Sequence, residues 1–323
     1  MINEVPIRIG FVGCGTIARI HMKNLSEMEE VEIVSICDVL LGRAEKEAKK
    51  FNAKVYCDYK KMFDEEKLDG CYICVPPFAH SSIESLAAKK GINIFIEKPI
   101  GLNIDEAKNT EKIIKKNGII VSVGYVFRYL DIVEKAKELL KGKKVALVCG
   151  KYFGGVVPVD WWTIKEKSGG QIVEQTTHII DLSRYLVGEI DMIFAQGYKY
   201  SMSNCNYNIN EASSINLHFK NKAIGCINST CLLSGWFPKL EIIAKNMHLK
   251  IYSLDTLKII TNGKTETINS KVDGYWEEDV IFINSVKTKD DSKIKCNYSD
   301  ALKTLIATLA ANKSIESGEK IYL

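Results

Sequence analysis

Residues 7–18 read IRIGFVGCGTIA, and this segment decides the fold. Its first half, residues 7–13, is largely apolar, as expected of a strand that is covered on both faces of a parallel sheet. Gly13 then permits a tight turn, Gly15 leaves room for a close backbone approach, and the small Ala18 lets the following helix pack on the strand. The segment therefore predicts a strand, a glycine turn and a helix in immediate succession.

The same alternation continues through residues 1–125. Apolar segments predict strands at residues 7–13, 32–38, 70–75, 92–97 and 119–125. Segments with helical periodicity lie between them, at residues 18–28, 41–51, 81–89 and 104–116. Strands that alternate with helices of this length are typical of βαβ units. We therefore predict an α/β domain with a doubly wound parallel sheet in residues 1–125.

The pattern changes after residue 126. Helices are expected at residues 131–140 and 172–186, with a strand near 144–149 between them. Residues 192–285 read as successive strands separated by turn residues such as Asn221, Asn246 and Gly263. A last helix is expected at residues 299–312. Strands joined by short turns favour antiparallel pairing, so residues 126–323 are predicted to form an α+β domain with a large, mostly antiparallel open sheet.

Length and composition exclude several classes of protein. The chain has 323 residues, which suits two domains. Its 44 basic and 40 acidic side chains give a net charge of +4, too little for a dedicated nucleic-acid binder. The N-terminus lacks the features of a secretory signal, and no apolar run reaches the roughly 18–20 residues that span a bilayer. We expect a soluble, cytoplasmic protein with no nucleic-acid or membrane partner.

Ten cysteines raise the question of disulfides or metal binding. Cys71 and Cys74 form a C-x-x-C pair, which elsewhere serves redox or metal chemistry. Here the pair lies in a predicted strand, where positions three apart face opposite ways. No second cysteine or histidine pair completes a zinc site. The sequence therefore favours reduced thiols in the core and predicts no metal.

The glycine turn at residues 13–18 also indicates a dinucleotide site. Free amides at the helix start, around Thr16 and Ile17, suit a pyrophosphate. Asp38 ends the second predicted strand, 20 residues after Ala18, where a carboxylate accepts hydrogen bonds from the adenosine ribose. A 2′-phosphate there would meet a like charge, so NAD is favoured over NADP. Arg43 leaves NADP open, since it could pair with such a phosphate or simply be a surface residue.

With these motifs the chain resembles the glucose–fructose oxidoreductase, inositol dehydrogenase and MocA family of NAD(P)-dependent oxidoreductases. The likeness covers nearly the whole chain, and beyond residues 13–18 and 38 its segments are Arg43-Ala44, Pro76-Pro77 with His80, Glu97-Lys98-Pro99, Gly124-Tyr125, Gly169-Gly170 with Glu174, His178 and Asp181, and Ser314 with Gly318. The resemblance implies hydride transfer between a nicotinamide and a sugar, an inositol or a related polyol. It also implies a homodimer or homotetramer joined through the C-terminal sheet.

The resemblance further implies roles for individual residues. Lys98 and His178 correspond to the catalytic pair, and Glu174 to a substrate-binding aspartate. Further cofactor contacts are expected from Arg43, Pro76, Pro77, His80 and Glu97, and further substrate contacts from Arg128, Trp162 and Asp181. Four positions depart from the family pattern, and they bear on substrate choice: Glu174 for aspartate, Thr176 for glycine, and Val126 and Phe127 where Asn-Arg often stands.

The residues themselves support the same catalytic pair. Lys98 follows a parallel strand, and ligands bind at the carboxyl ends of such strands. Pro99 favours an extended Lys98. Glu174, His178 and Asp181 are spaced i, i+4 and i+7, which places them on one face of an α-helix. The alternatives are a solvated lysine and a core histidine. Trp161, Trp162 and Trp236 could stack on a sugar ring or could equally be core residues.

Two other functions are compatible with this sequence. The first is a non-catalytic regulator that binds a dinucleotide, since a fold does not dictate a function. The second is an enzyme that holds NAD tightly and uses transient oxidation for elimination or hydrolysis. Retention of both Lys98 and His178 favours catalysis.

Overall fold

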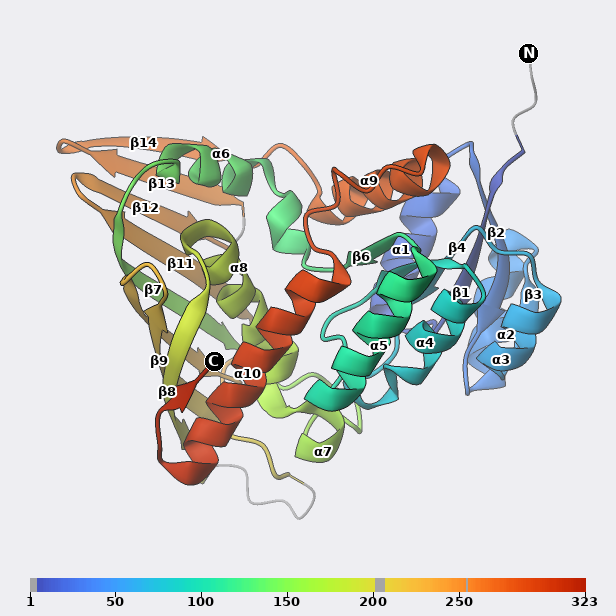
Figure 1. Ribbon diagram of the computed structural model, residues 1–323, viewed down its shortest axis with the longest axis horizontal. Coiled ribbons are helices and arrows are strands. Elements are labelled where there is room, and N and C mark those ends of the chain that lie inside the picture. Colours follow the sequence, from blue (N-terminus) through green and yellow to red (C-terminus); the bar gives the residue numbers. More distant parts are fainter. Residues whose placement is uncertain (1–4, 201–206, 254) are drawn as a thin grey trace. The chain divides into compact units, whose positions relative to one another are not determined.

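The computed structural model describes residues 5–200, 207–253 and 255–323. The chain forms two compact units (Figure 1). The first extends to Val126 and also contains Asp273–Leu302, and the second contains Phe127–Val272 and Lys303–Leu323. The sequence division at residue 125 had assigned residues 273–302 to the second domain. The difference arises because a C-terminal helix completes the core of the first unit.

The first unit is built on a six-stranded parallel sheet in the order β3-β2-β1-β4-β5-β6. Its strands are β1 (Ile7–Val12), β2 (Val31–Cys37), β3 (Lys54–Tyr56), β4 (Gly70–Ile73), β5 (Asn93–Ile96) and β6 (Val121–Val123). Its helices are α1 (Thr16–Ser26), α2 (Leu41–Phe51), α3 (Tyr59–Glu65), α4 (Ser82–Lys89), α5 (Ile104–Asn117) and α9 (Gly274–Thr288). The predicted doubly wound sheet is confirmed, and the short β3 and α3 are additions to it.

Aromatic rings form the centre of this unit. Tyr72 stacks on Phe11 and Phe95, with ring centroids 5.0 Å and 4.7 Å away. Phe282 of α9 packs edge-on against Tyr72 at 5.4 Å. Residues 274–285 fall at the end of the segment predicted as successive strands, and this prediction is wrong: the structure has the helix α9 there, which Asp273 caps by accepting from Tyr275 N at 2.9 Å. Tertiary packing, not local propensity, decides the form of this segment.

Cys71 and Cys74 both lie in this core. Their side chains belong to β4 and the position just after it, and both residues are buried. Burial raises the pKa of both thiols well above its ordinary value, so they remain protonated at neutral pH. The arrangement fits the interpretation of these cysteines as small apolar core residues.

The second unit is built on a nine-stranded sheet in the order β14-β13-β12-β11-β7-β10-β9-β8-β15. Its strands are β7 (Val145–Gly154), β8 (Ile190–Tyr198), β9 (Ala212–Phe219), β10 (Ile224–Thr230), β11 (Trp236–Ala244), β12 (Met247–Tyr252), β13 (Thr256–Thr261), β14 (Lys264–Asn269) and β15 (Ile321–Tyr322). Among the strand pairs described, β7 and β10 run parallel and the others run antiparallel. The predicted large, mostly antiparallel sheet is confirmed.

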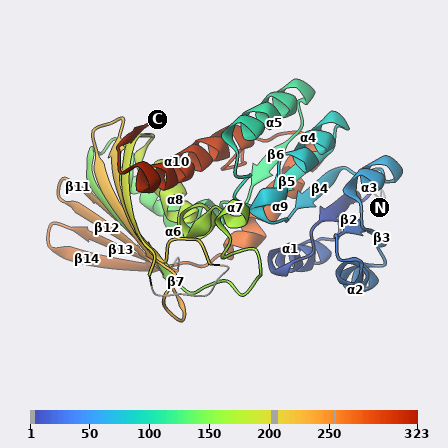
Figure 2. The ribbon, with the colours of Figure 1, turned by 90° about the horizontal axis from the view of Figure 1, so that it is seen from below.

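Helices cover one face of the nine-stranded sheet. They include α6 (Asp131–Leu140), which contacts β12 and β13, and α8 (Thr177–Val187), which contacts β7 and β11 (Figure 2). A short helix, α7 (Lys165–Ser168), and the part of α10 (Tyr298–Ser317) from Lys303 onward also belong to this unit. On the other face, side chains of β9 and β10 such as Asn216, Ile224 and Asn228 are exposed. Among the residues described, no helix combines the length and apolarity needed to cross a membrane.

Candidate cofactor and catalytic site

The carboxyl ends of the parallel strands bring most of the predicted cofactor residues to one edge of the first sheet. The strand ladder continues beyond the strands themselves through backbone bonds of 2.8–2.9 Å, which run from Gly13 N to Cys37 O, Cys74 N to Val12 O, Glu97 N to Ile73 O and Gly124 N to Ile96 O. These bonds fix the first residue after β1, β4, β5 and β6. In doubly wound sheets this edge, near the point where the strand order reverses, is where ligands bind.

The glycine turn after β1 has two glycines with different roles. Gly13 has φ +87°, and a Cβ there would lie 2.2 Å from the carbonyl oxygen of Cys74, so the fold itself requires glycine. Gly15 precedes α1 with φ −70°, and a Cβ there would meet nothing within 4 Å. Thr16 is exposed, Ile17 is half-buried, and Ala18 is buried against the sheet. The space in front of Gly15 and the start of α1 fits a pyrophosphate.

Asp38 lies directly after β2 and is held beside the glycine turn. Its Oδ2 accepts from Cys14 N at 3.1 Å and from the Cys14 thiol at 3.2 Å, and its Oδ1 accepts from Leu40 N at 2.9 Å. Burial, together with the Asp38 carboxylate, raises the pKa of the Cys14 thiol to about 12, so Cys14 remains a donor. Arg43 is exposed on α2. The carboxylate is therefore fixed in the place expected for a ribose contact.

The segment after β4 contains Pro76, Pro77 and His80. Pro77–Ala79 forms a short 3-10 turn, and His80 is buried behind it. The Nδ1 atom of His80 lies 2.5 Å from Glu84 Oε1, in the first turn of α4. In this structure His80 therefore joins the segment to α4.

Glu97 and Lys98 follow β5 and differ in exposure. Glu97 is buried, and its Oε2 accepts from the Lys98 backbone N–H at 3.1 Å. Its Oε1 lies 3.2 Å from His21 Nε2, within the protein interior. Lys98 is half-buried. Of this pair, Lys98 is the residue with solvent access, and Glu97 points into the unit.

In the second unit, His178 lies in α8 and is largely buried. Its ring stacks on Phe127, with centroids 4.4 Å apart and an interplanar angle of 26°. Ile172–Thr176 forms a π-helical turn before α8 begins at Thr177. The segment predicted as a single helix over residues 172–186 is therefore a π-helical turn followed by an α-helix. Glu174 lies in the π turn, so its orientation relative to His178 departs from the i, i+4 geometry of an α-helix; such turns are frequent at functional sites.

Trp162 and Glu174 contact each other directly. Trp162 is fully buried, and its Nε1 donates to Glu174 Oε2 at 2.6 Å. The ring of Trp162 therefore presents no face for stacking on a substrate, in contrast to the role expected from sequence. Glu174 is half-buried, and Trp162 fixes one of its oxygens.

An open groove of about 710 Å³ lies in the second unit. Its walls are residues 154–158, Gln175 and residues 231–236. Trp236 is 45% exposed in this groove, and its Nε1 donates to the Tyr152 hydroxyl at 2.7 Å. The Trp236 ring also lies 6.3 Å from the ring of Phe127, on which His178 stacks. Trp236, not Trp162, is the tryptophan that offers a surface near His178.

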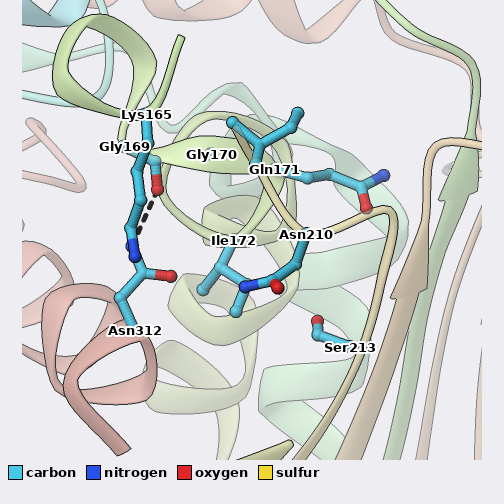
Figure 3. A pocket seen from close by; sticks show the side chains of 9 residues that line it. Lys165, Gly169, Gly170, Gln171, Ile172, Asn210, Ser213 and Asn312 are labelled. Atoms are coloured by element: carbon cyan, nitrogen blue, oxygen red, sulfur yellow. Dashed lines mark hydrogen bonds between the residues drawn. The ribbon is translucent and has the colours of Figure 1, made fainter. Parts of the chain in front are cut away.

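A second cavity lies between α7 and α10 (Figure 3). It measures about 10 Å³, the room of about one water molecule. Asn312 Nδ2 donates to Gly169 O at 2.7 Å beside it (Figure 3). This cavity is too small for a substrate.

Arg128 and Asp181 were predicted to contact substrate, and the structure buries both. Arg128 and Asp181 are each 1% exposed, and Arg128 Nε and Nη2 donate to the two Asp181 oxygens at 2.8 Å and 2.6 Å. The Thr304 hydroxyl donates to the same carboxylate at 2.8 Å. Arg128 and Asp181 form a buried ion pair that links residue 128 to α8, and neither side chain is accessible to a ligand.

The comparisons with known proteins agree with this fold. A family model described as an oxidoreductase family with an NAD-binding Rossmann fold matches residues 7–125, and an oxidoreductase C-terminal domain model matches residues 128–204. The protein is thus an NAD-binding oxidoreductase. More particularly, the chain belongs to the glucose–fructose oxidoreductase, inositol dehydrogenase and MocA family.

Individual relatives cover almost the full chain. A myo-inositol 2-dehydrogenase of Thermotoga maritima is 25% identical over 338 residues, which include 98% of each protein. The structure of a levoglucosan dehydrogenase with NADH and L-sorbose superposes with a TM-score of 0.88 at 18% identity, covering 99% of both chains. The structure of GenD2 from gentamicin A biosynthesis with NAD gives 0.87 at 18% identity, covering 99% of this chain and 97% of that one. At such identities the solved structures establish the fold.

Proposed function

We propose that this protein is a dehydrogenase that acts on a CH–OH group of a sugar, an inositol or a related polyol, with NAD as the preferred cofactor. The observation that carries the proposal is the arrangement at one sheet edge: open space before Gly15, a fixed Asp38 carboxylate and the half-buried Lys98. The name of the full-length myo-inositol 2-dehydrogenase relative supports the substrate class.

The residues present fit a bound NAD. The amides that open α1 suit its pyrophosphate, and the Asp38 carboxylate suits the two hydroxyls of its adenosine ribose. Pro76 and Pro77 follow the neighbouring strand and are expected to border the cofactor. When bound, NAD supplies the acceptor or donor of a hydride. The Asp38 charge disfavours the 2′-phosphate of NADP, and the exposed Arg43 is not needed for NAD.

The acid–base chemistry is assigned to Lys98 and His178. Oxidation of an alcohol removes a proton from oxygen as hydride leaves carbon. A histidine suits the proton, because its ordinary pKa of about 6.5 lies close to neutral pH. A protonated lysine, with an ordinary pKa of about 10.4, stabilises a developing alkoxide. Retention of both residue types at these positions favours catalysis over a purely regulatory role.

Substrate recognition is assigned to the groove of the second unit. The exposed ring of Trp236 suits the apolar face of a sugar or cyclitol ring, and the Glu174 carboxylate suits a hydroxyl. Gln175, which follows Glu174, lines the same groove. The sheet face that carries Ile224 is the proposed surface for a homodimer or homotetramer.

A substrate panel tests this function. Inositols, aldoses, sugar acids and their keto forms are mixed with the protein and NAD or NADH, and absorbance of the reduced nicotinamide is followed. We expect turnover with at least one polyol and no turnover with simple primary alcohols. Binding of NAD without turnover of any member would instead support a regulator. Product formation without net change in NADH would support transient oxidation during elimination or hydrolysis.

A further inference from the structure

A buried polar network in the first unit leads from α9 through α1 to the end of β5. We define the His21 network as His21, Glu97 and Asp279, with Asn24 at its outer end. His21 is fully buried, and its Nδ1 lies 2.7 Å from Asp279 Oδ1 while its Nε2 lies 3.2 Å from Glu97 Oε1. Asn24 Nδ2 donates to Asp279 Oδ2 at 2.9 Å. Both ring nitrogens of His21 are thus engaged by carboxylates.

The charge state of His21 follows from these contacts. Burial alone lowers the pKa of an imidazole, but the Asp279 and Glu97 carboxylates raise the pKa of His21 well above its ordinary value. Burial raises the pKa of the adjacent Glu278 carboxyl well above its ordinary value, so that group adds no further negative charge at neutral pH. His21 is therefore a buried imidazolium that donates to two carboxylates, and these charge-assisted bonds are stronger than neutral ones.

The network ends at the backbone of Lys98. Glu97 Oε1 faces His21, while Glu97 Oε2 accepts from the Lys98 N–H at 3.1 Å. A Cβ at Gly124 would lie 2.8 Å from Glu97 Oε1, so the position after β6 leaves space for the carboxylate only because it has no side chain there. The carboxylate of Glu97 is held between His21, Gly124 and the backbone N–H of Lys98.

We propose that His21 is a positioning residue for the acid–base group of this enzyme: through Glu97 it fixes the backbone from which the Lys98 side chain projects. The inference rests on the proposed function, since it takes Lys98 as the group that stabilises the alkoxide. A reacting group displaced by about 1 Å can cost about 10²-fold in rate. A network that ties the Lys98 amide to two helices prevents such displacement from within the unit.

A double-mutant cycle tests the proposal. His21→Gln removes the imidazolium, and we expect it to lower the single-turnover rate of hydride transfer about 10- to 100-fold, with the Kd for NAD changed less than about 3-fold. In a Lys98→Ala background the same change should alter the rate less than about 2-fold, because a residue that acts through Lys98 has nothing left to position. A purely structural role predicts equal effects in both backgrounds.

Two further variants keep the test decisive. Gly124→Ala disturbs the Glu97 carboxylate without changing His21 and should show the same dependence on Lys98, even where His21→Gln does not fold. Thr110→Val removes buried side-chain bonds to Ser81 O and Ser85 Oγ, away from the network, and should lower stability while leaving the hydride-transfer rate within about 2-fold.

The outcomes separate this inference from the proposed function. Full hydride transfer in Lys98→Ala would remove the assignment of Lys98 and this inference with it, while the proposed dehydrogenase function would stand. Absence of turnover by the wild type with every polyol of the panel would remove the proposed function. Full hydride transfer in folded His21→Gln and Gly124→Ala, with Lys98→Ala impaired, would remove this inference alone. A stoichiometric metal in the purified protein, detected by elemental analysis and lost in His21→Gln, would also overturn it, because the imidazole would then be a ligand and not a donor to Glu97.

Discussion

Arg128 donates two hydrogen bonds to the carboxylate of Asp181, and both side chains are buried in the second unit. Removing one member of such a buried pair leaves an uncompensated charge. We therefore expect Asp181→Ala to lower the free energy of unfolding by about 3–5 kcal/mol, measured by urea denaturation. The exposed pair of Lys135 and Glu138 provides the control, and Glu138→Ala should cost less than about 1 kcal/mol. Native stability with a raised KM in Asp181→Ala would restore Asp181 as a substrate contact.

Alanine substitutions at the two glycines of the turn after β1 should have different effects, one on stability and the other on NAD binding. Gly13→Ala places a Cβ against the Cys74 carbonyl oxygen at positive φ, so the protein should lose stability by several kcal/mol, seen as a lower Tm. Gly15→Ala meets no protein atom within 4 Å, so its Tm should stay near that of the wild type. Its Kd for NAD should rise at least 10-fold, because the new methyl group occupies the space before α1. Unchanged NAD affinity in Gly15→Ala would place the pyrophosphate elsewhere.

Cofactor choice should depend on Asp38. Titration of the wild type by calorimetry should give tighter binding of NAD than of NADP, because a 2′-phosphate meets the carboxylate. Asp38→Ser should reduce the ratio of the Kd for NADP to the Kd for NAD by at least 10-fold. Arg43→Ala is the matched control, and it should leave NAD affinity within about 2-fold. Tighter NADP binding by the wild type, abolished in Arg43→Ala, would reverse the assignment.

Lys98 and His178 should be required for chemistry and not for folding. Lys98→Ala and His178→Ala are expected to bind NAD and to lose about 10²- to 10⁴-fold in the rate of hydride transfer, the range for acid–base groups. Lys116→Ala, on the exposed side of α5, and His218→Ala, beside Asp191 in the second unit, serve as controls and should retain the rate. A pre-steady-state rate equal to that of the wild type in either catalytic variant excludes the role of that residue.

The bond from Trp162 to Glu174 offers a test of substrate recognition. Trp162→Phe keeps most of the buried ring but removes the N–H that fixes the carboxylate. A hydrogen bond to a charged group contributes about 1.5–3 kcal/mol, so KM for the polyol should rise about 10-fold or more, with the Kd for NAD unchanged. Trp161→Phe, at the half-buried neighbouring position, should leave KM within about 2-fold. Equal KM values in the two variants would remove Glu174 from substrate binding.

The local signals in the sequence predicted much of the first unit. The helices α2 and α6 begin and end where their periodicity predicts, and α5 is capped by Asn103, which accepts from Asp105 N at 2.9 Å. The glycine turn and Asp38 lie together because adjacent parallel strands end at the same edge, a rule of topology that needs no coordinates. The resemblance to a family supplied the second half of the site.

What the sequence missed depends on contacts between distant residues. Nothing local in residues 274–288 distinguishes a buried helix from a strand; the choice is made by the rings of Tyr72 and Phe95 that receive Phe282. His21 lies three residues after Ala18 on the buried face of α1, which marks it as internal but not as bonded to Asp279, 258 positions away. The π turn at Glu174 likewise follows from packing, since the i, i+4 spacing of the sequence predicts an ordinary α-helix.

The return of residues 273–302 to the first unit has a consequence for synthesis of the protein on the ribosome. When Val126 has been made, the nascent chain holds every strand of the parallel sheet but lacks Phe282, and His21 faces no Asp279. Residues 127–272 must then be translated, which takes about 7–30 s at roughly 5–20 residues per second. During that interval the side of α1 that packs against α9 in the finished protein lacks this partner. A ribosome-arrested chain ending at residue 126 should be cut readily by protease, and one ending far enough past Leu302 to expose α9 should resist.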